Sequence, residues 1–301
     1  MKPLDESPAI FETNIENLEL IARGKVRDIY TIDNNHMLIV TTDRLSAFDV
    51  VFPQPIPGKG ELLTRVSNFW FERSSDLVAN HLTDLKLEDY VSRQDAIDLA
   101  PRSIIVRKMK TLPVEAIVRG YIIGSGWKDY QASGQICGIQ LPTGLQQAQQ
   151  LPEPIFTPST KASVGDHDIN VSFEHTVELV GEDMARQIRE ISIRLYKMAS
   201  EYAQPRGIII ADTKFEFGLD ENGQLVLIDE ILTPDSSRYW PADQYRIGTS
   251  PPSYDKQFIR DYLETLDWDK TPPAPHIPQE LIDRTREKYQ QVHDILTANP
   301  A

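Results

Sequence analysis

Apolar and polar positions along the chain predict a mixture of short strands and longer helices. Strand-like runs lie around residues 20–22, 27–32, 37–41 and 48–52. Apolar residues at helical spacing mark 62–78, 175–204, 253–266 and 280–297. Two more strand-like runs, 102–110 and 114–123, are expected to be separated by Pro113. Many antiparallel strands with interleaved helices favour an α+β fold over a doubly wound sheet.

Two segments have the composition of connections. Residues 140–170 are rich in Pro, Gln, Gly and Ser, and residues 270–279 are rich in Pro. A long connection inside a compact domain is usually functional or disordered, and we expect 140–170 to form an ordered, functional loop. The second segment is expected to link the last two helices.

Charged residues follow a regular pattern in the segment ADTKFEFGLDENGQLVLIDE, residues 211–230. The apolar run 207–210 before it predicts a strand covered on both faces. Asp212, Lys214 and Glu216 occupy every second position, so a strand directs all three to one face. The following Asn-Gly at 222–223 predicts a two-residue hairpin turn, which would place Glu216 directly opposite Asp229.

Two carboxylates that face each other across a sheet repel unless a cation lies between them. A water-exposed sheet edge is the simpler interpretation, because alternating charge is common in half-exposed strands. Against it, both strands of this hairpin are apolar outside their charged positions. Mg²⁺ would relieve the repulsion, since it prefers one or two carboxylates together with substrate phosphates. The pattern therefore suggests metal-assisted nucleotide chemistry, with Lys214 as a point charge for a phosphate or carboxylate.

Basic residues elsewhere suggest further anion sites. Arg119 lies inside an apolar strand and needs an anionic partner there, and the Gly-Ser-Gly turn 124–126 that follows would open a helix with free amides. Arg238 follows the predicted hairpin and could grip a phosphate or carboxylate with two hydrogen bonds. Lys25 and Arg27 lie in ARGKVRDIY, which forms either a plain basic turn or a hairpin that covers a phosphate.

Composition limits the possible partners. The chain has 301 residues and a formal net charge of −14, which argues against nucleic acid or anionic lipid as a partner. A single cysteine, Cys137, excludes an internal disulfide and a cysteine-based zinc cluster. The first residues lack the apolar core of a signal peptide, and no apolar run approaches the ~20 residues that span a bilayer. We therefore expect a cytoplasmic protein. Because the motifs of covalent hydrolases and zinc peptidases are missing, we expect it to act by positioning and charge.

Six segments, in this order, together resemble the phosphoribosylaminoimidazole-succinocarboxamide synthase (SAICAR synthetase) family: ARGKVRDIY, DRLSAFDV, VRGYIIGSGWKDY, EPIFTPSTK, IIIADTKFEFG and DEILTPDSSRYW. The resemblance extends from about residue 20 to 295, and the loop STKASVGDHD and the C-terminal extension look most like the yeast and fungal-type branch.

This resemblance implies an ATP-dependent ligase of purine biosynthesis. It would join L-aspartate to the carboxylate of CAIR, the carboxylated aminoimidazole ribonucleotide, giving SAICAR, ADP and phosphate through an acyl phosphate. The implied architecture is two-lobed and ATP-grasp-like, with a small kinase-like lobe at 1–110, a larger lobe at 111–252 and a C-terminal helical segment at 253–301 that packs on the body. A monomer is expected.

The resemblance also implies roles for individual residues. Those expected to contact ATP are Gly24, Lys25, Val26, Arg27, Lys108, Glu216 and Asp229, of which Glu216 and Asp229 would hold Mg²⁺. Those expected to contact CAIR or aspartate are Asp49, Arg119, Ser125, Lys161, Asp212, Lys214 and Arg238. Lys214, Arg238 and Asp168 are the expected catalytic residues, and Asp168 would bind the aspartate amine or take its proton.

Two other functions remain open at this point. A small-molecule kinase could use the same lobes and metal pair, but its product would be a phosphoester instead of an amide. A non-catalytic nucleotide-binding regulator would need no second anion pocket, so the basic residues around Arg119 and Arg238 speak against it.

Overall fold

The computed structural model of the chain describes residues 8–161 and 169–298. Contacts between these residues divide the chain into two compact units. Unit 1 contains the described residues up to Phe69, His81–Lys108 and those from Tyr254 onward; unit 2 contains Trp70–Asn80 and Met109–Ser253. Both helices and strands are present, in agreement with the predicted mixed class. None of the helices in the described ranges is both long and apolar enough to cross a bilayer.

Unit 1 is built on an antiparallel sheet with the order β1-β2-β3-β6. These strands are β1 (Glu19–Arg23), β2 (Arg27–Thr31), β3 (His36–Thr41) and β6 (Ser103–Arg107). Burial alternates along β2, so that Asp28 and Tyr30 point inward. Helix α2 (Arg93–Leu99) begins at Ser92, whose hydroxyl accepts a hydrogen bond from the amide of Asp95.

A second core in unit 1 joins the two ends of the chain. The hairpin of β4 (Leu45–Ala47) and β5 (Val50–Phe52) packs with α6 (Gln257–Glu264) and the start of α7 (Gln279–Thr297). The buried residues of this core are Leu45, Ala47, Phe52, Ile56, Ile259, Leu263, Ile277 and Ile282. The C-terminal helices are thus part of unit 1. Helix α1 (Lys59–Arg73) begins in unit 1, and the division between the units falls inside it.

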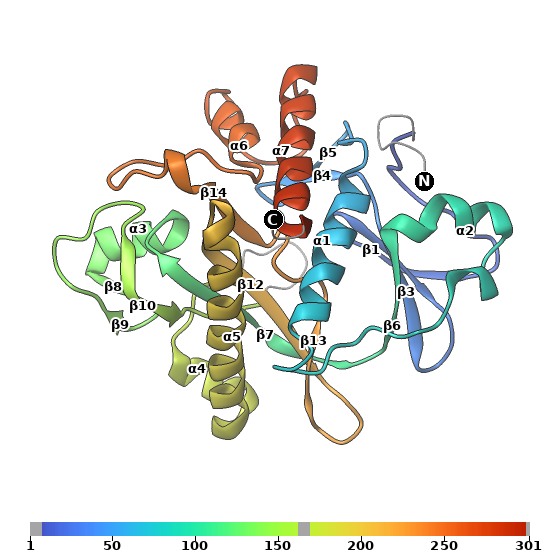
Figure 1. Cartoon of the computed structure of the whole chain (residues 1–301), viewed down its shortest axis with the longest axis horizontal. Helices are drawn as coiled ribbons and strands as arrows, with labels where there is room; N and C mark the ends of the chain where they lie inside the picture. The colour runs from blue at the N-terminus through green and yellow to red at the C-terminus, as the bar shows by residue number, and fades with distance from the viewer. Residues whose placement is uncertain (1–7, 162–168, 299–301) are drawn as a thin grey trace. The chain divides into compact units, whose positions relative to one another are not determined.

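Unit 2 is organised around two long antiparallel strands, β7 (Lys110–Tyr121) and β12 (Ile208–Leu219). The sheet order is β10-β7-β12-β13 (Figure 1). In addition, β11 pairs with β7 and β14 pairs with β12. The flanking strands are β10 (Gln150–Phe156), β11 (Ser159–Thr160), β13 (Leu225–Ile228) and β14 (Ser237–Pro241). All four residues of β13 are buried, as expected for a strand covered on both faces.

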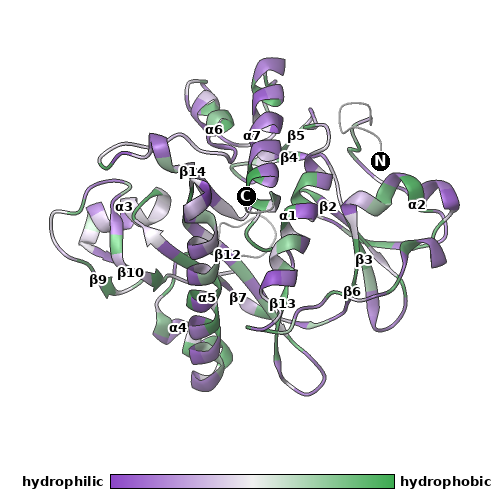
Figure 2. Cartoon of the chain, viewed as in Figure 1, coloured by the Kyte–Doolittle hydropathy of each residue, from purple (hydrophilic) through white to green (hydrophobic). Residues whose placement is uncertain are grey.

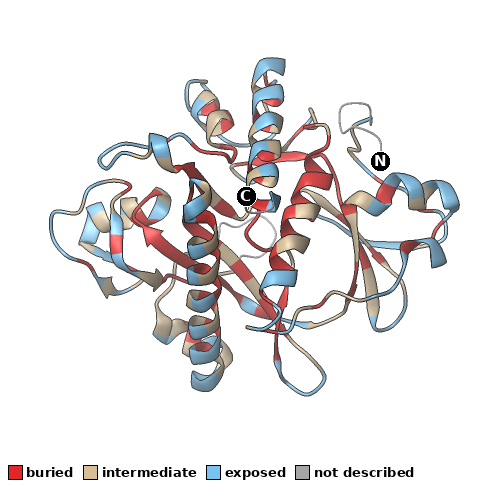
Figure 3. Cartoon of the chain, in the orientation of Figure 1, coloured by how far each residue is buried: buried red, intermediate tan, exposed pale blue. Residues whose placement is uncertain are grey.

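Helix α5 (Glu182–Ala203) packs against β7, β10 and β12. Its hydrophobic and hydrophilic positions alternate at helical spacing (Figure 2), and buried and exposed positions follow the same period (Figure 3). The prediction of a single helix at 175–204 is wrong, because α4 (Phe173–Val180) ends at Gly181 before α5 begins. Gly181 has a φ of 86°, which a helix cannot contain.

The remaining elements of unit 2 lie between β7 and β10. Helix α3 (Gly124–Ser133) directly follows β7 and ends at Gly134, which has a left-handed conformation with φ 73°. The short strands β8 (Gln135–Ile136) and β9 (Ile139–Gln140) then pair with each other.

Two expectations about the connections are also wrong. Pro113 does not separate two strands but lies within β7, where the pairing with β12 shifts between Glu216 and Gly218. A proline fits such an irregularity because it has no amide hydrogen to donate to the ladder. The segment 140–170, predicted to be a loop, contains β10 and β11, both paired with β7.

The hairpin that joins β12 and β13 has a different register from the one predicted. Leu219 pairs with Leu225, and Glu216 pairs with Ile228 instead of Asp229. The turn has three residues between Asp220 and Gln224, because the Asp220 carboxylate accepts hydrogen bonds from the amides of Asn222 (2.9 Å) and Gln224 (2.8 Å). A two-residue type I′ turn needs a positive φ at both central residues, whereas here Gly223 (φ 74°) has one and Asn222 does not.

This turn makes a testable prediction. Gly223→Ala should destabilise the protein by about 1 kcal/mol, because the left-handed conformation penalises a Cβ atom, although no atom lies within 4 Å of the new methyl group. Asn222→Ala should change stability by less than ~0.5 kcal/mol. Urea denaturation of the two variants measures both values, and an equal cost at the two positions would instead support the two-residue turn.

Candidate active site

One face of the unit 2 sheet carries a row of charged side chains. Asp212, Lys214 and Glu216 follow one another at every second position of β12. On the neighbouring strand β7, Arg119 lies opposite Asp212 and Glu115 lies opposite Glu216. The alternation predicted from the sequence therefore does place the three β12 residues on one face, with further charged residues beside them.

Asp212 has an arginine directly across from it on each side. Arg119 of β7 and Arg238 of β14 are its two cross-strand neighbours. Arg119 Nη1 donates to Asp212 Oδ2 at 2.9 Å, and Arg238 Nη1 donates to the same oxygen. Arg119 is only 3% exposed; burial lowers the pKa of its guanidinium and Asp212 opposes that change. The anionic partner expected for a buried strand arginine is thus Asp212.

The same two arginines reach the first turn of α3. Arg119 Nη2 donates to Ser125 Oγ at 3.0 Å, and a Cβ atom at Gly124 would lie 2.5 Å from Arg238 Nη2. Gly124 (φ 60°) therefore allows the guanidinium of Arg238 to lie against the start of the helix. The first turn contains no acidic residue and has no side-chain cap. Two guanidinium groups beside helix N-terminal amides form a site suited to a phosphate.

A lysine and two glutamates form the second half of the charged face. Lys214 Nζ donates to Glu115 Oε1 and to Glu216 Oε1, both at 2.7 Å. Lys161 forms an ion pair with the other oxygen of Glu216, and Ser159 Oγ donates to Glu115 Oε2 at 3.0 Å. The positive charge that separates the facing carboxylates is thus an amino group of the protein itself.

These contacts fix the charges of Glu216 and Lys214. Burial acts to raise the pKa of Glu216, but Lys214 and Lys161 outweigh it and lower that pKa to about 2. Burial acts to lower the pKa of Lys214, but Glu216 and Glu115 outweigh it and raise that pKa above its ordinary value. At neutral pH Glu216 is an anion and Lys214 a cation, so Lys214 is suited to electrostatic stabilisation and not to accepting a proton.

Asp229 does not face Glu216 across the hairpin, so the predicted carboxylate pair is wrong in its register. Strand β13 ends at Ile228, the partner of Glu216, and Asp229 follows with a left-handed φ of 67° that turns the chain out of the ladder. The carboxylate across from Glu216 is Glu115, contributed by the other neighbouring strand. The predicted turn and the observed one differ by one residue, which is enough to change every cross-strand partner.

The donor set of this face is chemically suited to Mg²⁺. Glu216 is ionised and offers hard oxygen donors, as Mg²⁺ requires. Within 8–161 and 169–298, no group of three or more His, Cys, Asp or Glu side chains is placed to hold a metal ion. A metal ion bound here would therefore depend on oxygens of a substrate as well as on carboxylates of the protein.

The other predicted residues of the described chain lie in unit 1. Gly24, Lys25, Val26 and Arg27 form the β1–β2 turn and the start of β2, and the amide of Gly24 donates to the carbonyl of Arg27 at 2.8 Å. Lys25 Nζ forms an ion pair with Asp49, and both side chains are about half exposed.

The last two residues of the predicted site are Lys108 and Asp168. Lys108 Nζ donates to the carbonyl of Asp33 at 2.6 Å. The predicted catalytic residue Asp168 lies outside the described residues.

Two residues of the charged face were missed in the sequence. Glu115 carries the carboxylate opposite Glu216, and Thr157 Oγ1 accepts a hydrogen bond from Arg119 Nε at 3.0 Å. The spacing could have revealed Glu115, because it stands four residues before Arg119 in the same strand and so shares its face. Thr157 follows β10 and has no comparable signal.

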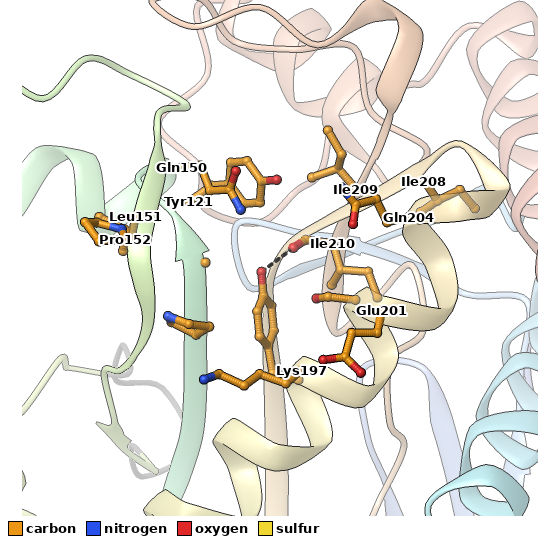
Figure 4. A pocket seen from close by; sticks show the side chains of 14 residues that line it. Tyr121, Gln150, Leu151, Pro152, Lys197, Glu201, Gln204, Ile208, Ile209 and Ile210 are labelled. Carbon is orange, nitrogen blue, oxygen red and sulfur yellow. Dashed lines mark hydrogen bonds between the residues drawn. The ribbon is translucent and has the colours of Figure 1, made fainter.

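A cavity of about 270 Å³ in unit 2 contains none of the predicted residues. It is lined by α5, β10, β7 and the beginning of β12 (Figure 4). Tyr196 of α5 enters the sheet here and donates from its hydroxyl to the carbonyl of Ile210 at 2.6 Å. A Cβ atom at Gly120 would lie 1.9 Å from that hydroxyl, so Gly120 is what admits the tyrosine.

The mixed α/β fold carries a face of fixed cations and carboxylates, which is an arrangement suited to phosphate-bearing substrates. The chain belongs to the SAICAR synthetase family, whose sequence model matches residues 20–275. The family recognised from six sequence motifs is thereby confirmed.

Individual relatives are similar over nearly the whole chain. Phosphoribosylaminoimidazole-succinocarboxamide synthase of Thioalkalivibrio sulfidiphilus is 60% identical over 288 residues, which cover 95% of this chain and 97% of the relative. The enzyme of the same name from Methylococcus capsulatus is 59% identical over 292 residues, covering 96% and 97%. Among solved structures, SAICAR synthase from Saccharomyces cerevisiae in complex with SAICAR has a TM-score of 0.89 at 46% identity, covering 97% of this chain and 99% of that one.

The charges of the Glu216 cluster predict a pH dependence. Because the pKa of Glu216 falls from 4.5 in the unfolded chain to about 2 in the folded protein, its ionised form adds stability above pH ~4.5 that is lost as the pH falls toward 2. Glu216→Gln should lower the unfolding free energy by about 3 kcal/mol at pH 7, and the two proteins should converge as the pH approaches 2.

Denaturant titrations of both proteins between pH 7 and pH 2 measure this difference. Glu221→Gln, which changes an exposed residue of the β12–β13 turn, is the control and should follow the wild type. A Glu216→Gln deficit that stays constant over the whole pH range would contradict the assigned charge.

Proposed function

We propose that the chain joins L-aspartate to the carboxylate of CAIR at the expense of ATP, giving SAICAR, ADP and phosphate. The observation that supports this most directly is the cluster of Arg119, Asp212 and Arg238 at the start of α3. CAIR carries both a phosphate and a carboxylate, and such a cluster can bind a phosphate through guanidinium groups and helix amides.

The residues of unit 2 then have separable roles. Arg119, Ser125 and the first amides of α3 bind the phosphate of CAIR, and Asp212 keeps the two arginines in place. Arg238 and Lys214 lie toward the carboxylate of CAIR, where their positive charges orient it and stabilise charge that develops during transfer. Lys161 pairs with Glu216 and is proposed to contact a substrate anion as well.

The reaction proceeds in two steps in this proposal. A carboxylate oxygen of CAIR attacks the γ-phosphorus of ATP, so that an oxygen–phosphorus bond forms and the bond to ADP breaks. The amine nitrogen of aspartate then attacks the acyl carbon, the amide bond forms, phosphate leaves, and the nitrogen loses its proton. Asp168, outside the described residues, is proposed to bind the amine or to take that proton.

The proposed ATP contacts are Gly24, Lys25, Val26, Arg27 and Lys108 together with Glu216 and Asp229. Glu216 and Asp229 would hold Mg²⁺, which when bound neutralises phosphate charge. Asp49, the partner of Lys25, is proposed to contact CAIR or aspartate.

We also propose an ATP-grasp-like architecture for the chain, with lobes at 1–110 and 111–252 and the helical segment 253–301. These bounds differ from the two units in that Trp70–Asn80 belongs to unit 2 and the described residues from Tyr254 onward belong to unit 1. A cytoplasmic monomer is proposed, in line with C-terminal helices that pack on β4 and β5 of their own unit.

The reaction product distinguishes this proposal from its alternatives. With ATP, CAIR, aspartate and Mg²⁺, the purified protein should release ADP and form an amide that mass spectrometry identifies, and ADP release should require both CAIR and aspartate for sustained turnover. A stable phosphoester would indicate a kinase instead. Nucleotide binding without turnover would indicate a regulator.

A substitution in α3 tests the phosphate site itself. Ser125→Ala removes the hydroxyl that meets Arg119 and should raise the KM for CAIR about tenfold, the usual cost of one hydrogen bond to a charged group, with the KM for ATP unchanged. Ser133→Ala is the matched control, because Ser133 lies at the other end of the same helix and donates to the carbonyl of Asp129. Equal KM values for CAIR in both variants would contradict the assignment.

A further inference from the structure

Arg44 is a buried arginine of unit 1, outside every residue set assigned above. It is 3% exposed and lies just before β4. Its guanidinium reaches the β1–β2 turn, where Nη2 donates to the carbonyl of Gly24 at 2.9 Å and Nε donates to the carbonyl of Lys25 at 3.2 Å. Nη1 donates to the carbonyl of Phe11 at 2.6 Å. One side chain thus holds two successive carbonyls of the turn.

The next carbonyl of the turn is held by the neighbour of Arg44. The amide and the hydroxyl of Thr42 both donate to the carbonyl of Val26, at 2.9 and 2.8 Å. Three successive carbonyls of the turn therefore accept hydrogen bonds from the segment 42–44. In a planar trans peptide the N–H group points opposite to the carbonyl, so the amides of Lys25 and Val26 point away from Arg44. Successive amides directed outward form a concave site for an anion.

Arg44 is itself held in a single orientation by Asp28. The Oδ1 atom of Asp28 accepts from Arg44 Nη2 at 2.8 Å and from Arg23 Nε at 3.2 Å. The Oδ2 atom accepts from the amide and the hydroxyl of Thr13, both at 2.8 Å. Burial acts to raise the pKa of Asp28, but the hydrogen bonds from Thr13 and Arg44 outweigh it and lower that pKa. An ionised, fully bonded carboxylate thus fixes the guanidinium under the turn.

We propose that Arg44 is a positioning residue for nucleotide binding, which orients the amides of the β1–β2 turn toward the phosphates of ATP without touching the nucleotide. This inference rests on the proposed function, in which Gly24, Lys25, Val26 and Arg27 contact ATP. Holding several carbonyls of the turn at once requires an arginine. A planar guanidinium donates from three nitrogens in fixed directions, whereas a lysine ammonium donates from one nitrogen only.

The experiment compares Arg44→Lys with Arg102→Lys. Arg102 is also 3% exposed. It donates from Nη1 to Oδ1 of Asp43 at 2.8 Å, and Asp43 is the residue directly before Arg44. Its substitution disturbs the same buried segment and leaves the turn contacts of Arg44 in place. Both variants are assayed for kcat and for the KM values of ATP, CAIR and aspartate, and ADP binding is measured by calorimetry.

Arg44→Lys should raise the KM for ATP and the Kd for ADP about tenfold, because charged hydrogen bonds to the turn are lost, while the KM for CAIR stays within about twofold. Arg102→Lys should lower the melting temperature to a similar extent and leave both nucleotide constants unchanged. An equal rise of the nucleotide constants in the two variants, or a loss confined to kcat in Arg44→Lys, would overturn the proposal.

A second variant keeps the test informative if Arg44→Lys does not fold. Thr42→Val removes the hydroxyl that meets the carbonyl of Val26 and keeps the backbone hydrogen bond. It should raise the KM for ATP by about two- to fivefold, as expected for one neutral hydrogen bond; no change would count against the proposal.

Lys25→Ala separates this inference from the proposed function. If Lys25→Ala leaves the KM for ATP unchanged, the turn is not the nucleotide site, and the assignment of ATP contacts fails together with the inference. If Lys25→Ala weakens ATP binding and Arg44→Lys does not, only the role of Arg44 is disproved.

Discussion

The positions of the charged side chains of unit 2 depend on the ion pairs that the carboxylate of Asp212 forms. It lies on the central strand β12 between arginines of both neighbouring strands, and the same oxygen accepts from Arg119 and Arg238. Without this carboxylate, Arg119 would be a buried cation with only hydroxyl partners, which costs several kcal/mol. Because Arg119 also holds Ser125, the position of α3 relative to the sheet depends on the same ion pair.

In the second charged cluster, Glu216 and Lys214 hold opposite charges that do not change near neutral pH. The pKa of Glu216 is lowered to about 2, and the pKa of Lys214 is raised because Glu216 and Glu115 outweigh the opposing effect of burial. Each group therefore keeps one charge state throughout the physiological range, and stabilisation of developing charge requires no reorganisation. The proton that an attacking amine must lose has to go to a group other than Lys214 and Glu216.

The sequence predicts the local part of this site and misses the non-local part. Alternation alone placed Asp212, Lys214 and Glu216 on one face, because that pattern depends only on strand geometry. The cross-strand partner of Glu216 could not be predicted, because it depends on how Asp220 bonds the turn amides, and that bonding shifts the register by one residue. Glu115 is 99 residues from Lys214 along the chain, so only the folded sheet brings them together. The identity of the expected substrates came from the resemblance to a known family and not from the periodicity.

Each of the two units contains a buried arginine that is paired with a buried carboxylate. In unit 2, Arg119 is held by Asp212 and bonds Ser125 in the first turn of a helix. In unit 1, Arg44 is held by Asp28 and bonds carbonyls of a tight turn. In each case a buried carboxylate offsets the cost of burying the guanidinium. Another donor of the same guanidinium then holds a short segment, through the hydroxyl of Ser125 in unit 2 and through backbone carbonyls of the turn in unit 1. The geometry of both proposed anion sites then depends on a buried ion pair, so the same net charge on a more flexible lysine would not reproduce it.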